Sequence, residues 1–496
     1  MPEVFQNKLC YGDNLKILKE HMGNDTVDLI YLDPPFNSKA TYNIPFKEKN
    51  GTDSEAQIKA FDDTWHWDTQ AALSFHNVVT RGGKPADALL GFEKLHGSND
   101  LLAYLSNMAE RLIELHRVLK PTGTIYLHCD PTASHYLKIL MDSIFGAKNF
   151  RNEIIWAYRG GGSPKTDFGR RHDVILRYSK TDEYTFNADS IRIPYQAEEI
   201  GRTDDAMWGK HKGTDKIYKP NPLGKIPEDW WLINPLNQND PERLGYPTQK
   251  PRELLRRIVL ASSVEGDIVL DPFCGCGTTI SVAQELNRKW IGIDITHLAI
   301  SLMQFRLKHE FPNLENYYIT SGLPETLNEA RDLANENKYH FQLWALGLVG
   351  ARGIDIKKGA DKRIDGRLNF HSDGTLKGKI EQIIFSVKGG HVTVSQVRDL
   401  VGVVNREKAA IGVFITLEPP TKPMREEAAS AGFYQSQDLN AKKYQKIQIL
   451  TIEDILNGKR IDCPQFVLDD GNVTLKKAQQ VIVRKRVKHA ELDQFE

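Results

Sequence analysis

Apolar residues in the first 310 positions fall into short runs and helix-like patterns that follow one another along the chain. The run at positions 29–32 stops at Asp33, and the run at positions 268–270 stops at Asp271. Short apolar runs bounded by turn residues are typical of buried strands in a parallel sheet. Positions 101–119 instead repeat apolar residues at helical spacing, which predicts a helix.

Further elements follow the same rhythm. Residues 124–128, 153–158 and 290–293 have the pattern of strands, and residues 280–286 have the pattern of a helix. Alternation of strand and helix favours an open, mostly parallel sheet with helices on both faces. The expected fold class of this region is therefore α/β.

A second and smaller α/β pattern occupies the C-terminal part of the chain. Helices are predicted at 341–346 and from 394, and strands at 380–388 and 411–416. The expected organisation is a first domain over 1–310 with an insert at 187–244, a linker at 311–338, a second domain over 339–460, and a basic tail at 461–496.

Composition is that of globular domains. A chain of 496 residues is too long for one ordinary core, and 40% hydrophobic with 26% charged residues fits two or three such domains. No apolar run approaches a membrane span and the N-terminus has no signal-peptide pattern, so a cytoplasmic protein without membrane partners is expected. Five scattered cysteines argue against a disulfide framework.

The first motif of candidate functional residues is Asp33-Pro34-Pro35-Phe36, which directly follows a predicted strand. The prolines remove two backbone donors and fix φ, so the carbonyl oxygens of Asp33 and Pro34 can face a ligand. A carboxylate, a free carbonyl and an aromatic ring at a strand end form a pocket for a planar group that bears an amine, such as a nucleobase. The alternative is a strand that ends on prolines beside a solvated Asp33.

A second motif lies in residues 267–279, where a strand runs into a glycine turn and then into a helix. Gly275 and Gly277 form the turn, a layout typical of a nucleotide-type cofactor loop at a helix N-terminus. Asp294 ends the next predicted strand, twenty-three positions after Asp271. This spacing suits an acid that binds ribose hydroxyls.

With Thr248-Gln249-Lys250-Pro251 upstream, the two motifs resemble the S-adenosylmethionine-dependent amino-methyltransferases of DNA. The order is the permuted one (β-class, type III Mod-like), in which the catalytic motif precedes the cofactor motif. The resemblance covers residues 8–310 and implies a Rossmann-like methyltransferase fold. It implies that S-adenosylmethionine is bound by Asp13, Lys250, Asp271, Phe273, Gly275, Gly277, Thr278 and Asp294. For Asp13, a helix N-cap is an equally good interpretation.

The resemblance also implies the reaction. Hydrogen bonds from an exocyclic amine to Asp33 and to the Pro34 carbonyl would direct the nitrogen lone pair at the methyl group, with Phe36 stacked on a base that has left the helix. Asp at position 33 favours adenine N6 within the family, and cytosine N4 is the alternative. Methylation at cytosine C5 is excluded because it needs a cysteine after a proline, and no Pro-Cys dipeptide occurs.

Double-stranded DNA is the expected partner. Net charge is zero, with 65 residues of each sign, so DNA binding must come from local basic clusters. Residues 187–244 mix basic with aromatic side chains and are the predicted target-recognition insert, or otherwise a solvated insertion with a small core. RNA methylation and an inactive DNA-binding protein are weaker hypotheses, and the sequence leaves a homodimer or a partner restriction subunit open.

The second domain resembles the restriction-endonuclease-like fold of the Mrr type. Asp365 and Lys388 match two of its catalytic positions, and Asp365 would bind Mg²⁺. Ser386 stands where a second acid or glutamine is expected, and serine is a poorer ligand for magnesium. The sequence therefore leaves two hypotheses open, DNA cleavage and a DNA-binding module that does not cleave.

Overall fold

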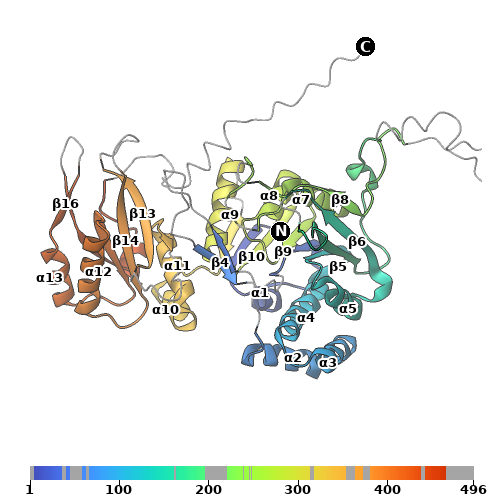
Figure 1. Cartoon of the computed structure of the whole chain (residues 1–496), viewed down its shortest axis with the longest axis horizontal. Coiled ribbons are helices and arrows are strands. Elements are labelled where there is room, and N and C mark those ends of the chain that lie inside the picture. The colour runs from blue at the N-terminus through green and yellow to red at the C-terminus, as the bar shows by residue number, and fades with distance from the viewer. Residues whose placement is uncertain are drawn as a thin grey trace, which may run out of the picture.

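Two sheets organise the chain in the computed structural model, which describes residues 5–35, 41–44, 58–62, 66–160, 164–195, 221–237, 240–244, 246, 248–312, 318–353, 364–372, 380–436 and 442–464. Within these ranges the N-terminal region forms a nine-stranded sheet and the C-terminal region a five-stranded one, at the right and left of Figure 1. A separate ribbon pairs β3 (Thr41–Ile44) with β4 (Ile58–Asp62). None of the helices in the same ranges has the length and apolar character that a bilayer crossing requires.

The larger sheet has the strand order β11-β1-β10-β9-β2-β5-β7-β6-β8. Its strands are β1 (Asn7–Tyr11), β2 (Val27–Leu32), β5 (Leu119–Cys129), β6 (Phe150–Ala157), β7 (His172–Ser179), β8 (Trp230–Leu232), β9 (Ile268–Asp271), β10 (Lys289–Asp294) and β11 (Tyr318–Ser321). All neighbours are parallel except β7, which runs antiparallel to both β5 and β6.

Helices cover both faces of this sheet, as the alternation of strand and helix predicts. Side chains of β2 alternate between the faces: Ile30 and Leu32 pack into one core, and Leu29 and Tyr31 into the other. On the first face lie α1 (Asn14–His21), α2 (Thr69–Arg81), α3 (Lys84–His96), α4 (Asp100–Val118) and α5 (Ser134–Phe145). On the second face lie α7 (Arg252–Ser262), α8 (Thr278–Glu285) and α9 (His297–Glu310).

The expected alternation fails between β6 and β7. These strands pair antiparallel as a hairpin, and the described residues between them contain no helix. A parallel crossover needs about a dozen residues and usually a helix. The connecting residues 158–171 are rich in glycine and lack helical periodicity, so the chain turns back at once.

The sheet changes its winding direction between β9 and β2. The helix after β9, α8, packs on one face, while α4, which leads from β2 to β5, packs on the other. In open α/β sheets a crevice forms at the carboxyl ends of strands at such a point. The two motifs singled out in the sequence end β2 and β9, which are hydrogen-bonded neighbours.

The segment 311–338, predicted as a linker, contributes to both parts of the fold. Its strand β11 pairs with β1 in the larger sheet, and its helix α10 (Leu327–Glu336) belongs to the core of the smaller domain. α11 (Lys338–Leu348) follows and contacts α9. The two parts of the chain are therefore joined by packed helices.

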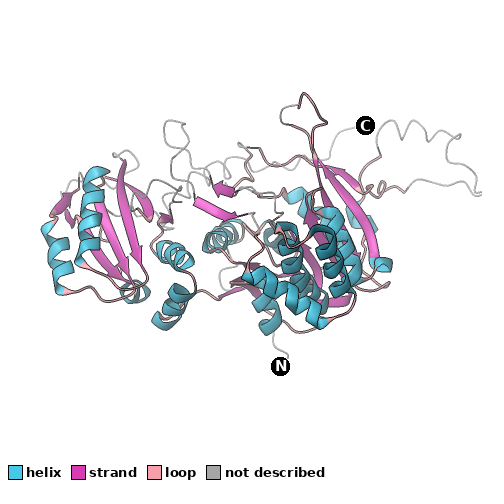
Figure 2. Ribbon diagram, turned by 60° about the horizontal axis from the view of Figure 1, so that its bottom comes forward, coloured by secondary structure: helices cyan, strands magenta, loops and turns pink. Residues whose placement is uncertain are grey.

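The smaller domain is a sheet with helices on either side (Figure 2). Its strands are β12 (Arg352–Gly353), β13 (Gly366–His371), β14 (Ile380–Lys388), β15 (Ile411–Thr416) and β18 (Ile447–Thr451), in that order. α10, α11 and α14 (Ile452–Leu456) cover one face, and α12 (Val394–Arg406) and α13 (Lys422–Ser430) the other. β16 (Phe433–Gln435) and β17 (Lys443–Gln445) form a hairpin beside it.

Candidate active site

A cavity of about 270 Å³ opens at the carboxyl ends of four adjacent strands, β1, β10, β9 and β2. Parallel strands place their carboxyl ends at one edge of a sheet, so residues far apart in sequence meet there. Its lining includes the predicted residues Asp13, Asp33, Pro34, Pro35, Lys250, Asp271, Phe273, Gly275, Thr278 and Asp294. Predicted residue Gly277 lies beside Thr278 at the start of α8.

Asp33 follows the last residue of β2 and is largely buried, with 15% of its side chain exposed. Its Oδ2 forms an ion pair with the ammonium group of Lys250, which is also largely buried. Lys250 precedes α7, so the segment before that helix crosses over the end of β2. The resemblance assigns Lys250 to the cofactor, whereas its closest ionic contact here is the proposed catalytic acid.

The glycine turn after β9 depends on backbone conformations that other residues rarely adopt. Gly275 has φ +49° and Gly277 has φ +75°, both in the left-handed region. A Cβ atom at position 277 would lie 2.5 Å from Cγ of Met303, so glycine is also required for close packing. The turn delivers the chain to the first residue of α8.

Asp294 ties this turn to the end of β10. Its Oδ2 accepts the Gly275 N–H at 2.9 Å, and its Oδ1 accepts both the N–H and the hydroxyl of Thr296 at 2.8 Å. Burial raises the pKa of Asp294, and the hydrogen bonds from Thr296 and Gly275 oppose the rise. The carboxylate is thus fixed where the turn, the strand end and the cavity meet.

Asp271 is 3% exposed and ends β9 beneath the cavity. Its Oδ1 accepts the Phe273 N–H at 3.1 Å. Burial raises the pKa of Asp271 to about 7, and the charges of Asp33 and Asp294 add to the rise. This carboxyl therefore changes its protonation near neutral pH.

Asp13 is the N-cap of α1, as one of the two interpretations proposed. Its Oδ1 accepts the N–H of Leu15 at 2.6 Å, and its Oδ2 pairs with Arg111 at 3.0 Å. The buried Asn14 beside it donates to the carbonyl of Pro272 at 2.7 Å and accepts from Arg111 at 2.7 Å. Asp13 both starts the helix and lines the cavity.

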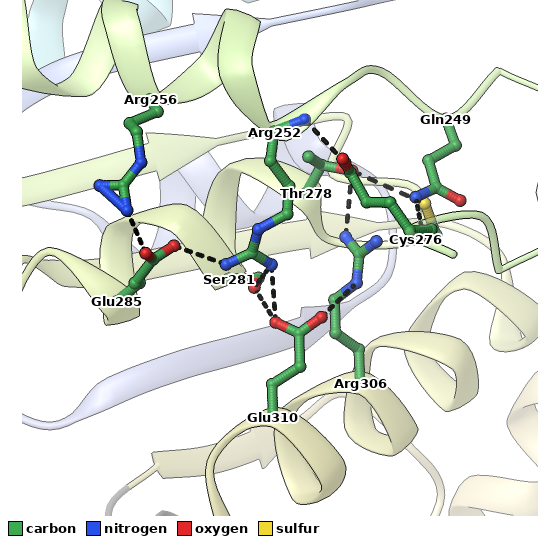
Figure 3. A network of polar contacts seen from close by, with 10 residues as sticks. Gln249, Arg252, Arg256, Cys276, Thr278, Ser281, Glu285, Arg306 and Glu310 are labelled. Carbon is green, nitrogen blue, oxygen red and sulfur yellow. Dashed lines mark hydrogen bonds and ion pairs between the residues drawn. The ribbon is translucent and has the colours of Figure 1, made fainter. Parts of the chain in front are cut away.

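A network of charged side chains braces the three helices behind the glycine turn (Figure 3). Arg252 of α7 pairs with Glu285 of α8 at 2.6 Å and with Glu310 of α9 at 2.7 Å. Arg306 of α9 donates to the hydroxyl of Thr278 at 3.0 Å. Because Thr278 is the first residue of α8, this network holds the turn against the sheet.

Asp365 and Lys388, the two residues matched to catalytic positions in the sequence, lie together in the smaller domain. Asp365 Oδ2 accepts the Val387 N–H at 2.6 Å and the ammonium of Lys388 at 3.3 Å. The amide of Gln342 donates to the carbonyl of Asp365 at 3.4 Å. Ser386 is 6% exposed, and no group of three or more His, Cys, Asp or Glu side chains suited to a metal occurs in the described part of the chain.

Comparison with known families decides what the first domain is. The model of the N6/N4 DNA methylases, described as DNA methylase, matches residues 27–305, more than half of the chain. The chain belongs to the N6/N4 DNA methylase family. The matched residues include the ends of β2, β9 and β10 and therefore most of the cavity. The fold class expected from the sequence is confirmed.

Relatives of this methylase are DNA-modifying enzymes. The type II methyltransferase M.BglII from Bacillus subtilis is 34% identical over 243 residues, which are 48% of this chain and 62% of M.BglII. The DNA adenine methyltransferase YhdJ from Escherichia coli K12 is 30% identical over 311 residues, 62% of this chain and 85% of YhdJ. The PvuII DNA methyltransferase (cytosine-N4-specific) is 14% identical, with a TM-score of 0.38 over 64% of this chain and 96% of that structure.

A second family model matches residues 344–457 and is described as NACHT-associated inactive restriction endonuclease 1. The methylase is therefore followed by a domain similar to a family of restriction endonucleases that is described as inactive. The match begins in α11 and ends beside α14, so it covers the smaller sheet.

Some predicted parts of the methylase lie outside the described residues. They are Phe36, residues 196–220 of the predicted recognition insert, and residues 465–496 of the basic tail. Sequence reasoning also missed residues at the cavity. Asn14, Arg111 and Tyr246 line it, and His128 lies behind Asp33. The sequence around His128 is that of an ordinary apolar strand, so it does not indicate that this histidine lies beside Asp33.

Proposed function

We propose that this chain is a site-specific methyltransferase that transfers a methyl group from S-adenosylmethionine to adenine N6 in double-stranded DNA. The observation that carries the proposal is the place of Asp33-Pro34-Pro35, at a strand end beside Asp271 and Asp294 in one cavity. Because Asp33 precedes the glycine turn along the chain, we also propose the permuted, β-class order.

The residues at the end of β2 suit an exocyclic amine. An adenine amine is a poor nucleophile because its lone pair is delocalised into the ring. The Asp33 carboxylate and the Pro34 carbonyl would each accept one N–H, which turns the lone pair out of the ring plane. Positioning the amine in this way supplies most of the rate gain. Duplex DNA must first release the base from its stack.

The cavity also suits a cationic cofactor. Four carboxylates, Asp13, Asp33, Asp271 and Asp294, line it together with two cations, Arg111 and Lys250. This surplus of negative charge favours a ligand that carries an ammonium and a sulfonium. S-adenosylmethionine, when bound, supplies a methyl group on a positively charged sulfur. The backbone of the glycine turn and the Asp294 carboxylate would hold its nucleoside part.

Adenine is favoured over cytosine by the acid at position 33. YhdJ, 30% identical to this chain, is named a DNA adenine methyltransferase. The alternative is a cytosine-N4 methyltransferase, since both bases present an exocyclic amine of the same geometry. We place the choice of DNA site in residues 187–244, because their basic and aromatic side chains suit contacts to phosphates and bases.

Single-molecule sequencing of DNA from cells that express the chain tests the base and the site together. We expect N6-methyladenine within one short sequence motif, absent from cells that express Asp33→Ala. Methylation of cytosine N4 at such a motif would establish the alternative. DNA without methylation at any motif, from cells with folded protein, would contradict the proposal.

Cofactor affinity should depend on pH through Asp271. A cationic ligand favours the ionised carboxylate, and the pKa of Asp271 in the free protein is about 7. Affinity should therefore be high above pH 7 and fall below it, by up to about eightfold between pH 7.5 and pH 6. Isothermal titration of S-adenosylmethionine across this range measures the change. An Asp271→Asn variant should give a nearly flat profile, and an unchanged slope would assign the titration to another group.

We propose that the smaller domain is a module of the Mrr type that does not cleave DNA. Asp365 Oδ2 is engaged by the Val387 N–H and by Lys388, and a serine stands at position 386. A lone carboxylate with one oxygen engaged is a weak site for Mg²⁺, which prefers several oxygen ligands. The match to a family described as inactive supports the same proposal.

A supercoiled plasmid that carries the target motif in unmethylated form should therefore stay intact with Mg²⁺ or Mn²⁺. Agarose electrophoresis after incubation with the purified chain measures this directly. Asp365→Ala should leave the result unchanged and lower thermal stability, because the Val387 N–H loses its acceptor. Nicking or linearisation that disappears in Asp365→Ala would restore the nuclease hypothesis.

A further inference from the structure

A fully buried histidine lies directly behind the carboxylate that receives the target amine. His128, in β5, has no exposed surface, and its Nδ1 is 3.9 Å from Asp33 Oδ1. The same Nδ1 is 2.9 Å from the Tyr31 hydroxyl, and Nε2 is 3.2 Å from Asp173 Oδ2. Tyr158 donates to the other oxygen of Asp173 at 3.4 Å.

These contacts fix the hydrogens on the imidazole. An ionised carboxylate accepts but cannot donate, so Nε2 carries a hydrogen toward Asp173. Burial raises the pKa of Asp173, but the hydrogen bonds from His128 and Tyr158 and the charge of Lys250 help to lower it overall. In a neutral imidazole Nδ1 is then unprotonated and accepts the Tyr31 hydroxyl. This is the same order of groups, carboxylate to imidazole, that equips a histidine to accept a proton.

Transfer to an amine creates a proton that must leave. The nitrogen gains a carbon and, to become a neutral methylated amine, gives up one of its two hydrogens. Asp33 Oδ2 is engaged by Lys250, so Oδ1 is the oxygen left to receive that hydrogen. Oδ1 is also the oxygen that faces His128.

We propose, on the basis of the proposed methyl transfer, that His128 takes up this proton through Asp33. As the N–C bond forms and the bond from the methyl carbon to the sulfonium sulfur breaks, one N–H bond of the amine also breaks and its hydrogen bonds to Asp33 Oδ1. That O–H bond then breaks as the hydrogen bonds to His128 Nδ1. The Tyr31 hydroxyl rotates to give up its place, and a contraction of about 1 Å brings Oδ1 within hydrogen-bond range. Asp173 balances the imidazolium until product leaves and the proton passes to solvent.

Groups on several elements set the charge at this histidine. The groups that face it are Tyr31 of β2, Asp33 just after β2, Asp173 of β7, Tyr158 just after β6, and Lys250 in the segment before α7. Two carboxylates flank the imidazole, and one ammonium lies beyond Asp33.

A single-turnover assay of methyl transfer to duplex DNA across pH 5.5 to 9, at saturating cofactor, tests this role. Saturation removes the separate pH dependence of cofactor binding. The parent rate should fall on acidification, because a protonated His128 cannot accept. His128→Gln, whose amide can still donate to Asp173, should be at least about tenfold slower at neutral pH. Its rate should also not fall on acidification as the parent rate does, so the acid limb of the pH–rate profile should be lost.

Two further variants separate chemistry from structure. His116→Gln, a change at a half-buried histidine of α4 that packs on Phe145, should keep the parent rate and profile. Asp173→Asn keeps His128 but removes the balancing charge, so the acid limb should move to lower pH. This variant decides the question if His128→Gln fails to fold.

The outcomes are distinct. A His128→Gln variant that keeps the parent pH profile, whatever its rate, overturns the proposal, as does an acid limb that stays in place in Asp173→Asn. A parent protein that methylates no DNA overturns the proposed function instead.

Discussion

Replacing Asp33 with alanine should lower methyl transfer to DNA by at least about a hundredfold and leave cofactor binding nearly intact. The variant removes the carboxylate that is proposed to receive the target amine and that is paired with Lys250. Asp271 and Asp294, the proposed cofactor carboxylates, stay in place because they belong to other strands. Transfer of tritium from labelled S-adenosylmethionine to duplex DNA measures the loss, and calorimetry measures cofactor binding.

Asp33→Asn is the matched control for this change. An asparagine keeps one acceptor oxygen and the size of the side chain but not the charge, so its activity should lie between those of the parent and the alanine variant. Thermal melting of each variant shows that the sheet is intact. Parent-like activity in Asp33→Ala would remove this residue from the mechanism.

Asp294→Ala should instead act on cofactor binding and weaken the affinity for S-adenosylmethionine by at least about tenfold. The variant removes the acceptor of the Gly275 N–H and of the Thr296 backbone and hydroxyl, so the glycine turn loses its tie to β10. Hydrogen bonds to a charged group contribute about 1.5 to 3 kcal/mol, and each 1.4 kcal/mol is about tenfold in affinity. Titration calorimetry measures the dissociation constant.

The comparison with Asp33→Ala makes this prediction specific. At saturating cofactor the Asp294→Ala variant should recover most of its single-turnover rate, whereas Asp33→Ala should not. An unchanged dissociation constant in Asp294→Ala would count against its part in holding the cofactor.

The strand ends of this fold could be predicted from the sequence because their signals are local. An apolar run that stops on Asp33, and another that stops on Asp271 before two glycines, each mark a strand and the turn after it. The alternation of strand and helix then predicts that such ends meet at one edge. The structure brings these residues into one cavity.

Other parts of the site depend on contacts between segments that are distant in sequence. His128 lies within an apolar strand, and its place behind Asp33 follows from the pairing of β2, β5 and β7. That pairing includes an antiparallel strand, which the expected rhythm of strand and helix did not predict. Lys250 meets Asp33 because the segment before α7 crosses over the end of β2, a path that no residue pattern specifies.

The interleaved order of the larger sheet also bears on how the protein is made. β1 (Asn7–Tyr11) leaves the ribosome long before its two partners, which are β10 (Lys289–Asp294) and β11 (Tyr318–Ser321). β2 likewise meets β9 only after residue 271 has been synthesised. Pairings between such distant segments form late and slowly. A nascent chain that ends before β9 would therefore carry Asp33 without the strands that complete its cavity.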